Sequence, residues 1–246
     1  MAKAANTRVG PCGFVERQAR LFAEFDLLEV QQTFYQPPQL NTARRWREAA
    51  PADFIFTIKA WQLITHEASS PTYRRLRESL TPRQRALAGA FRDNEVTRMA
   101  WARTRDFALA LGAKVVLFQT PARFRPTQDH LENLRAFFHR LDRAGLRLAF
   151  EPRGPEWLDD LLRPLLRELR LVHAVDPLLR RPLGKGLRYF RLHGVPAYNY
   201  RHRYTDAELL RIRKCLSRAW PNLVLFNNVH MAEDARRFRR LVEKNR

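Results

Sequence analysis

Acidic, basic and amide side chains recur along this chain at the ends of short apolar runs. The clearest case is Arg147–Glu151, which is too short for a helix and stops at the carboxylate of Glu151. Pro152 follows at once, and proline cannot donate a hydrogen bond to a sheet. We therefore expect a buried strand whose last residue points into a site, where a carboxylate can move a proton or bind a cation.

The same pattern occurs eight times. The predicted strands are 7–9, 26–30, 54–59, 115–119, 147–151, 171–176, 187–193 and 222–228. The polar residues at their ends or in the following loops are Cys12, Glu29, Lys59, His66, Gln119, Glu151, Arg153, Asp176, His193, Asn227 and Asn228. In a (β/α)8 barrel all strand C-termini open on one face, and the active site is built there. The series therefore predicts a chemical site or a polar binding site.

The residue types indicate what that site could do. Glu151 and Asp176 end neighbouring predicted strands, so they suit a general acid and base. The same pair could instead bind a divalent cation, with His193 as third ligand or as proton shuttle. No His-Glu-x-x-His motif is present, so no metal is assigned and these three residues stay candidate ligands.

The basic residues indicate an anionic ligand. Lys59 could pair with an anionic substrate or, if desolvated, form a Schiff base, and Arg153 offers a fork for a phosphate or carboxylate. The predicted catalytic residues are Glu29, Lys59, His66, Glu151, Asp176 and His193. The predicted substrate-binding residues are Tyr35, Gln119, Arg153, Asn227 and Asn228.

Structural roles compete with each of these assignments. Glu29 and Lys59 could simply neutralise each other, while Gln119, Asn227 and Asn228 could satisfy loop backbone groups. The histidine inside a strand, His173, is expected in the core. The remaining histidines are expected at the surface, namely His130, His139, His202 and His230.

Helical patterns fill the intervals between the runs. The predicted helices are 15–25, 42–49 with Thr42 as N-cap, 94–111 before Gly112, 127–144, 156–169, 205–220 and 232–245. Residues 31–38 are expected to form an irregular loop, 61–99 to begin with a long loop, and 177–186 to form a turn in place of a helix. Eight strand–helix units need about 250 residues, so the 246 residues predict a single parallel eight-stranded (β/α)8 TIM barrel over 1–246, with a long insertion after strand 3.

The net charge of +20 has two readings. A basic surface suits a nucleic-acid partner through its phosphates. Only six of the 45 basic residues are lysines, however, and arginines scattered through every helix also fit genome composition or heat adaptation.

Other bulk features suggest where the protein works. Cys12 and Cys215 match no zinc spacing, and no apolar run has the length of a signal peptide or the ~18 residues of a membrane span. We expect a soluble, reduced, cytoplasmic protein without a membrane partner.

Several motifs together resemble one protein family. They are Glu29-Val-Gln-Gln-Thr-Phe-Tyr35, Phe56-Thr-Ile-Lys59 with Ile64-Thr-His66, Leu117–Pro121, Glu151-Pro-Arg153, Tyr189–Gly194 and Phe226-Asn-Asn228. In this order they are similar to the YecE-like family, catalogued as domain of unknown function 72. The resemblance implies a TIM barrel with the matching polar residues around its mouth, and it implies no particular reaction. Two departures, Gly10-Pro-Cys-Gly13 and Gln32, put the first two loops in question.

Three functions follow for testing. The first is an enzyme that acts on a small anionic or sugar-like substrate in a polar acid/base pocket. It could be a hydrolase, a lyase or an isomerase, and a metal ion could assist the reaction. The alternative is a nucleic-acid binding or processing protein, similar to barrel-fold repair endonucleases, that uses the basic aromatic loop Tyr198–Tyr204. A non-catalytic binding or scaffold protein is the third.

Overall fold

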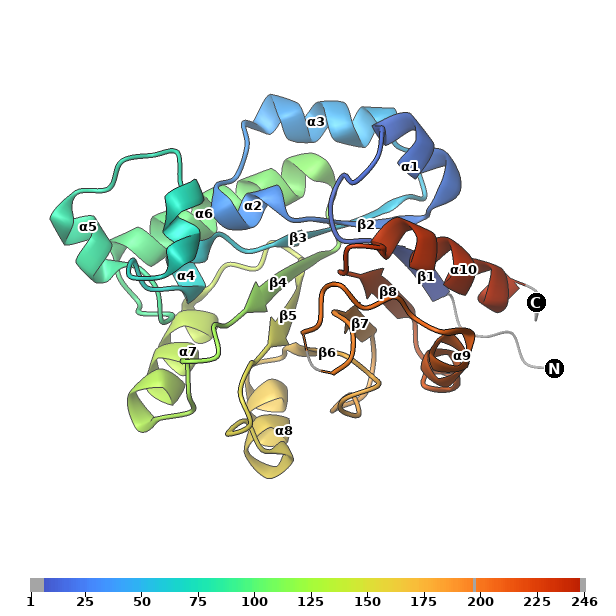
Figure 1. Cartoon of the computed structure of the whole chain (residues 1–246). Helices are drawn as coiled ribbons and strands as arrows, with labels where there is room; N and C mark the ends of the chain where they lie inside the picture. Colours follow the sequence, from blue (N-terminus) through green and yellow to red (C-terminus); the bar gives the residue numbers. More distant parts are fainter. Residues whose placement is uncertain (1–6, 197, 244–246) are drawn as a thin grey trace. The chain divides into compact units, whose positions relative to one another are not determined.

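The computed structural model describes residues 7–196 and 198–243, where strands and helices alternate along the chain (Figure 1). The strands are β1 (Thr7–Pro11), β2 (Leu27–Val30), β3 (Ile55–Lys59), β4 (Val115–Gln119), β5 (Arg147–Glu151), β6 (Val172–Val175), β7 (Arg188–Leu192) and β8 (Asn222–Phe226). The helices are α1 (Gln18–Glu24), α2 (Gln32–Tyr35), α3 (Leu40–Ala49), α4 (Gln62–Thr65), the 3-10 helix η1 (Pro71–Arg75), α5 (Pro82–Leu87), α6 (Glu95–Leu111), α7 (Gln128–Arg140), α8 (Asp159–Glu168), α9 (Asp206–Lys214) and α10 (Met231–Glu243). The strands fall on the eight predicted runs.

The chain divides into two compact units, which we describe separately. The first contains residues 7–30, 49–56, 172–196 and 198–243 of the described chain. In it β1 pairs with β8 in parallel, from Thr7 opposite Asn222 to Pro11 opposite Phe226, and β8, β7 and β6 continue in parallel. A bridge between Cys12 and Glu29 joins β1 to β2. Helix α10 lies along β1 and β8 (Figure 1).

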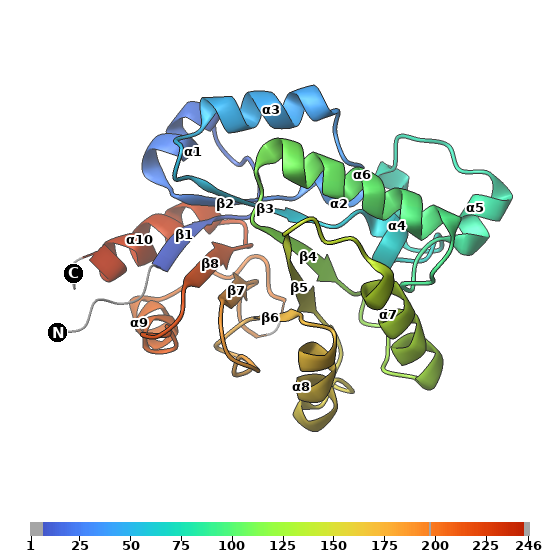
Figure 2. The ribbon, with the colours of Figure 1, turned by 180° about the vertical axis from the view of Figure 1, so that it is seen from behind.

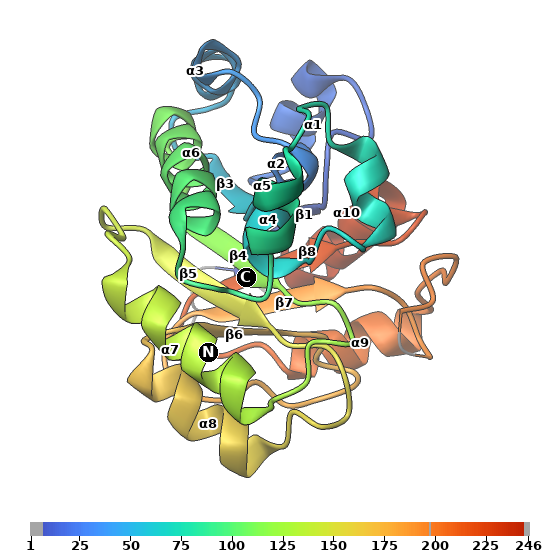
Figure 3. The same cartoon turned by 90° about the vertical axis from the view of Figure 1, so that its left-hand side faces the viewer.

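The second unit contains residues 31–48 and 57–171. Its strands β3, β4 and β5 are parallel, with Lys59 opposite Leu117 and Gln119 opposite Glu151. All five residues of β4 are buried, as expected for a parallel strand covered on both faces. The long helix α6 lies nearer the viewer than these strands in Figure 2, and it is in contact with α4 and α5, which are also labelled in Figure 3.

Local sequence explains where α6 begins and ends. The Asn94 side chain accepts hydrogen bonds from the N–H groups of Val96 and Thr97, and the Thr97 hydroxyl accepts from the N–H of Asn94, so the first turn has a complete capping box. Gly112 ends the helix at φ 67°, a left-handed conformation that favours glycine. The sequence predicts both ends correctly.

Two expected helix ends were wrong for reasons of local hydrogen bonding. The helix after Thr127 stops at Arg140, because Asp142 forms a turn with the N–H of Ala144 and its carbonyl accepts from Trp101. The helix after Thr205 stops at Lys214, because the side chain of Asn222 binds backbone groups of the following loop. The predicted end of the last helix at Asn245 lies outside the described residues.

Other corrections concern short elements. Helix α2 forms where an irregular loop was expected, since one turn gives no periodic signal. Helix α3 begins at Leu40, so Thr42 lies inside it and is not its N-cap. Helix α8 begins at Asp159, after a turn in which Trp157 is buried and donates to the carbonyl of Phe124.

Two further expectations can be compared with the described chain. The insertion after strand 3 begins with α4, where a long loop was expected, and continues with η1 and α5, where helical, charged segments were expected. The segment between β6 and β7 contains no helix, as predicted. In the part of the chain that the structure describes, no helix combines the length and the apolar character that crossing a bilayer requires. The prediction of a single domain over 1–246 stays a prediction.

Candidate functional site

Three consecutive strands of the second unit end in buried polar side chains. Lys59, Gln119 and Glu151 are 7%, 6% and 4% exposed at the ends of β3, β4 and β5. Arg153 connects two of them, because its Nη2 donates to Gln119 Oε1 at 3.1 Å and its Nε donates to Glu151 Oε1 at 3.4 Å. Its backbone N–H donates to the hydroxyl of Thr120, so the chain after β5 is fixed to the end of β4.

The end of β3 is packed against an aromatic ring. The Nζ of Lys59 lies 3.7 Å from the centroid of the Phe34 ring, a cation–π contact in a desolvated setting. The hydroxyl of Thr33 donates to the carbonyl of Lys59 at 2.6 Å, which fixes α2 to this strand end. Lys59 is therefore held in one place by helix α2.

His66 lies beside this lysine in the second unit. Its ring meets Phe34 edge-on at 4.9 Å, and its Nδ1 is 2.7 Å from the hydroxyl of Thr65. Burial, with the nearby charges of Lys59, Arg153 and Arg123, lowers the pKa of His66 to about 3. The imidazole is thus neutral at ordinary pH, and its conjugate acid is too strong for proton exchange near neutrality.

A second polar network occupies the first unit. Glu29 is fully buried at β2, and its Oε1 accepts from Arg191 Nη2 at 2.7 Å and Nε at 3.1 Å. The Oε2 accepts from the Tyr189 hydroxyl at 2.6 Å, and the Cys12 thiol donates to Oε1 at 3.4 Å. Burial and the neighbouring carboxylate of Glu29 raise the pKa of Cys12, so it stays a thiol.

Arg191 also fixes the tautomer of His193. Its Nη1 lies 3.0 Å from His193 Nε2, and a guanidinium can only donate, so Nε2 accepts and the ring proton is on Nδ1. The imidazole is 2% exposed, and the rings of Tyr198 and Tyr200 meet it edge-on at 5.4 and 5.8 Å.

The other predicted residues of the first unit differ in surroundings. Asp176 is 7% exposed, and its Oδ1 accepts from the N–H of Leu178. Asn228 donates to the His202 carbonyl at 2.7 Å and to Asp234 at 2.8 Å, which agrees with a structural role in the loop. Its Oδ1 is buried without a hydrogen-bond partner among the described residues. Asn227 is half-buried.

The structure places the predicted residues in both units. Lys59, His66, Gln119, Glu151 and Arg153 belong to the second unit, and Tyr35 lies there at the end of α2. Glu29, Asp176, His193, Asn227 and Asn228 belong to the first unit. Of the competing structural assignments, His173 is buried in the core as expected and accepts from the N–H of Leu183. Of the histidines expected at the surface, His139 is exposed, whereas His130, His202 and His230 are half-buried.

Arg191 and Tyr189 were missed by the sequence analysis. Both lie inside β7, a run that resembles an ordinary buried strand. A signal was present, because Tyr189, Arg191 and His193 alternate with Phe190 and Leu192, and alternation places the three polar side chains on one face.

A cation has no complete set of ligands among the described residues, where no group of three or more His, Cys, Asp and Glu side chains is arranged to hold one. Of the three candidate ligands, Asp176 and His193 lie in the first unit and Glu151 in the second. Metal binding by them stays a prediction.

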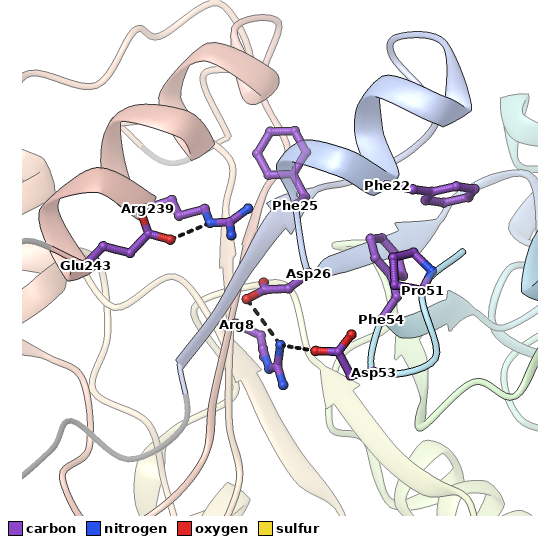
Figure 4. A pocket seen from close by; sticks show the side chains of 9 residues that line it. All are labelled: Arg8, Phe22, Phe25, Asp26, Pro51, Asp53, Phe54, Arg239 and Glu243. Atoms are coloured by element: carbon purple, nitrogen blue, oxygen red, sulfur yellow. Dashed lines mark hydrogen bonds and ion pairs between the residues drawn. The ribbon is translucent and has the colours of Figure 1, made fainter. Parts of the chain in front are cut away.

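A pocket of about 360 Å³ in the first unit lies at the N-terminal ends of strands (Figure 4). Arg8, near the start of β1, reaches Asp26 at 3.5 Å and Asp53 at 3.3 Å, and the rings of Phe22 and Phe54 also line the pocket. Burial raises the pKa of Asp26. In barrels this end serves stability, so we assign the pocket no chemistry.

Comparison with known proteins identifies the fold. A solved DUF72 family protein of Thermotoga maritima superposes with a TM-score of 0.72 at 20% identity, covering 97% of this chain and 99% of that one. One of Enterococcus faecalis gives 0.72 at 17% identity, covering 97% and 98%. A D-psicose 3-epimerase gives 0.59 at 11% identity, covering 96% and 98%. A search of curated proteins found no significant match.

These likenesses and the eight strands confirm the predicted fold class, a (β/α)8 TIM barrel. A family model described as "Protein of unknown function DUF72" matches residues 16–246, which agrees with the resemblance carried by the motifs. The chain belongs to the DUF72 family of proteins of unknown function.

Proposed function

We propose that this protein is an enzyme that acts on a small anionic or sugar-like substrate by acid/base chemistry. The observation that carries the proposal is the set of buried polar strand ends in the second unit, Lys59, Gln119 and Glu151, linked by Arg153. Burying such groups is costly, and a fold that needed only stability would place apolar residues there.

Each side chain has a role in this proposal. Glu151 moves the proton, because it is a carboxylate at a strand end with an arginine beside one oxygen. Arg153 is 17% exposed at its side chain, so it can reach a ligand and bind a phosphate or carboxylate in a bidentate manner. Lys59 supplies a second positive charge, and Gln119 orients Arg153.

His66 is a positioning residue in this proposal and moves no proton, because its low pKa leaves it neutral. In the first unit, both oxygens of Glu29 already accept hydrogen bonds, from Tyr189 and Arg191, so Glu29 has a structural role there.

Proton exchange next to a carbonyl tests the proposal directly. The protein is incubated in D2O with a panel of xylose, fructose, fructose 6-phosphate and gluconate, and proton NMR follows loss of the C–H signal. We choose sugars because the fold is shared with a D-psicose 3-epimerase. Wild type should exchange at least one compound, and Glu151→Gln should slow this by about 10²–10⁴-fold.

The matched control is Asp106→Asn, which removes an exposed carboxylate from α6 in the same unit. Thermal unfolding of each variant shows whether the fold is intact. Equal exchange in wild type and Glu151→Gln would remove Glu151 from the chemistry. Absence of exchange across the whole panel would count against a sugar-like substrate.

A second candidate function rests on the loop after β7. Tyr198 and Tyr200 are 38% and 41% exposed, and Arg201 beside them is exposed as well. Such side chains suit stacking on bases and contact with phosphates, and the net charge is +20. Binding of fluorescent single-stranded DNA should weaken steeply with salt if this function holds, and Tyr200→Ala should weaken it further. Affinity that does not change with salt would exclude phosphate neutralisation.

A further inference from the structure

A cavity of about 810 Å³ lies in the second unit between α2, α3, η1 and α6. It is separate from the residues of the proposed chemistry, since Lys59, Gln119 and Glu151 do not line it. Its size is in the range of small-molecule sites, which is about 300–1,000 Å³. Three arginines and one glutamate are its charged lining residues, namely Arg75, Arg77, Arg103 and Glu78.

One side of the cavity is held in shape by hydrogen bonds among Gln36, Glu78 and Arg103, which we call the Gln36 latch. The Oε1 of Gln36 accepts from the backbone N–H groups of Arg77 and Glu78 at 3.0 and 3.1 Å, and its Nε2 donates to Glu78 at 2.8 Å. Arg103 binds both oxygens of Glu78, at 2.8 and 2.5 Å. Hydrogen bonding from Arg103 lowers the pKa of Glu78 despite its partial burial. The latch thus joins the loop after η1 to α2 and α6 before any ligand binds.

The pairing of Glu78 with Arg103 leaves two positive charges for a ligand. The Cζ of Arg75 lies 3.6 Å from the centroid of the Tyr35 ring, so a cation–π contact holds this guanidinium at the cavity wall. Both Arg75 and Arg77 are exposed, and among the described residues neither forms an ion pair. Planar guanidinium groups are well suited to phosphate oxygens.

This excess of positive charge belongs to the cavity and not to the composition of the chain. The pocket of Figure 4 is lined by two arginines, Arg8 and Arg239, and by three carboxylates. A third depression, of about 410 Å³ beside α5, has one arginine, Arg83, paired with Glu95. Scattered arginines would make all three basic, whereas only this one of the three has excess positive charge.

The remaining walls suit a flat ring. Tyr35 and Trp46 contribute aromatic surface, and Pro37 and Pro38 contribute apolar surface. We propose that this cavity binds an organic phosphate of nucleotide size, with its phosphate on Arg75 and Arg77 and its ring against Tyr35 or Trp46. This site also gives Tyr35, predicted from the sequence as substrate-binding, a ligand of definite chemistry.

Calorimetric titration with adenosine 5′-monophosphate, adenosine and inorganic phosphate tests the site. The variants are Arg75→Gln and Arg77→Gln, and the matched control is Arg85→Gln, an exposed arginine on α5 outside the cavity. We expect saturable binding of the monophosphate, with adenosine at least tenfold weaker. Each cavity variant should bind about 10–100-fold more weakly, since each loses a charge-assisted hydrogen bond. The control and Glu151→Gln should bind as wild type does.

Several results would overturn the proposal. One is absence of saturable binding of the monophosphate, and another is unchanged affinity in both cavity variants. Equal loss in Arg85→Gln would show general attraction by a basic surface. If inorganic phosphate bound as tightly as the monophosphate, the ring of the ligand would contribute nothing to affinity. Because two arginines are tested and both are exposed, misfolding of one variant leaves the other to decide, and retained binding by Glu151→Gln separates this outcome from the test of the proposed enzyme.

Discussion

His66 makes the stability of this protein depend on pH in a way that one substitution can isolate. The side chain is 5% exposed, and burial beside Lys59, Arg153 and Arg123 lowers its pKa to about 3. In the unfolded chain the imidazole has the usual pKa of about 6.5. As pH falls below 6.5, only the unfolded state gains the proton, so stability is lost between about pH 6.5 and pH 3.

The size of the effect follows from the two pKa values. When the pH falls from 7.5 to 5.0, protonation of His66 stabilises the unfolded state by about 2 kcal/mol, while it stabilises the folded state by almost nothing. The three neighbouring cations keep their charge over this range, so they do not add to the slope. Replacing His66 by glutamine removes the titrating group while retaining a polar side chain.

Urea unfolding near pH 7.5 and pH 5.0 measures the effect as a difference of differences. From pH 7.5 to pH 5.0, the free energy of unfolding of wild type should fall by about 2 kcal/mol more than that of His66→Gln. Other titrating groups contribute equally to both proteins and cancel in this comparison. His139→Gln is the control, because His139 has a side chain 56% exposed on α7. Equal losses in wild type and His66→Gln would refute the reasoning, and so would a proton NMR titration of His66 near pH 6.5.

Two further predictions concern buried charge in the first unit. Arg191→Met leaves Glu29 buried without its main partner and should lower the free energy of unfolding, measured in urea, by about 3–5 kcal/mol. Adding Glu29→Gln should recover part of this loss. If the effects of the two substitutions simply added in the double variant, that result would contradict the pairing. Asp26 has a raised pKa in the folded state, so its folded state holds the proton more tightly and stability falls as pH rises above about 4. Asp26→Asn lacks this fall, so its stability relative to wild type should increase between pH 4 and pH 6.5. A constant or decreasing difference would show that Asp26 is not penalised by burial.

Features encoded in adjacent residues could be predicted from the sequence. The strands Val115–Gln119 and Arg147–Glu151 have the predicted bounds, because each apolar run is closed by its own polar residue and proline. Single helical turns such as α2 could not be predicted, since one turn is too short to show a helical period in the sequence. Helix ends set by side chains outside the helix, such as Asn222, could not be predicted either.

The partners of the candidate residues were harder to predict than the residues themselves. Glu29 suggested pairing with Lys59, the next cation at a strand end, but its observed partners include Arg191, which is 162 residues away. Only the register of β2, β1, β8 and β7 brings these two together, and no local pattern encodes it. The same holds for the latch of Gln36, whose partners follow η1 about 40 residues later.

Arg191 and Arg153 show how a structural and a functional arginine differ. Arg191, inside β7, is 0% exposed, and its hydrogen-bond partners include Glu29, His193 and Cys12 of its own unit. Arg153 is 17% exposed while it binds Glu151 and Gln119, so a ligand can reach it without displacing the fold. Substitution at Glu29 or Arg191 should therefore lower mainly the free energy of unfolding. Substitution at Glu151 should lower mainly the rate of the reaction, which makes Glu151→Gln the more informative variant for the proposed enzyme.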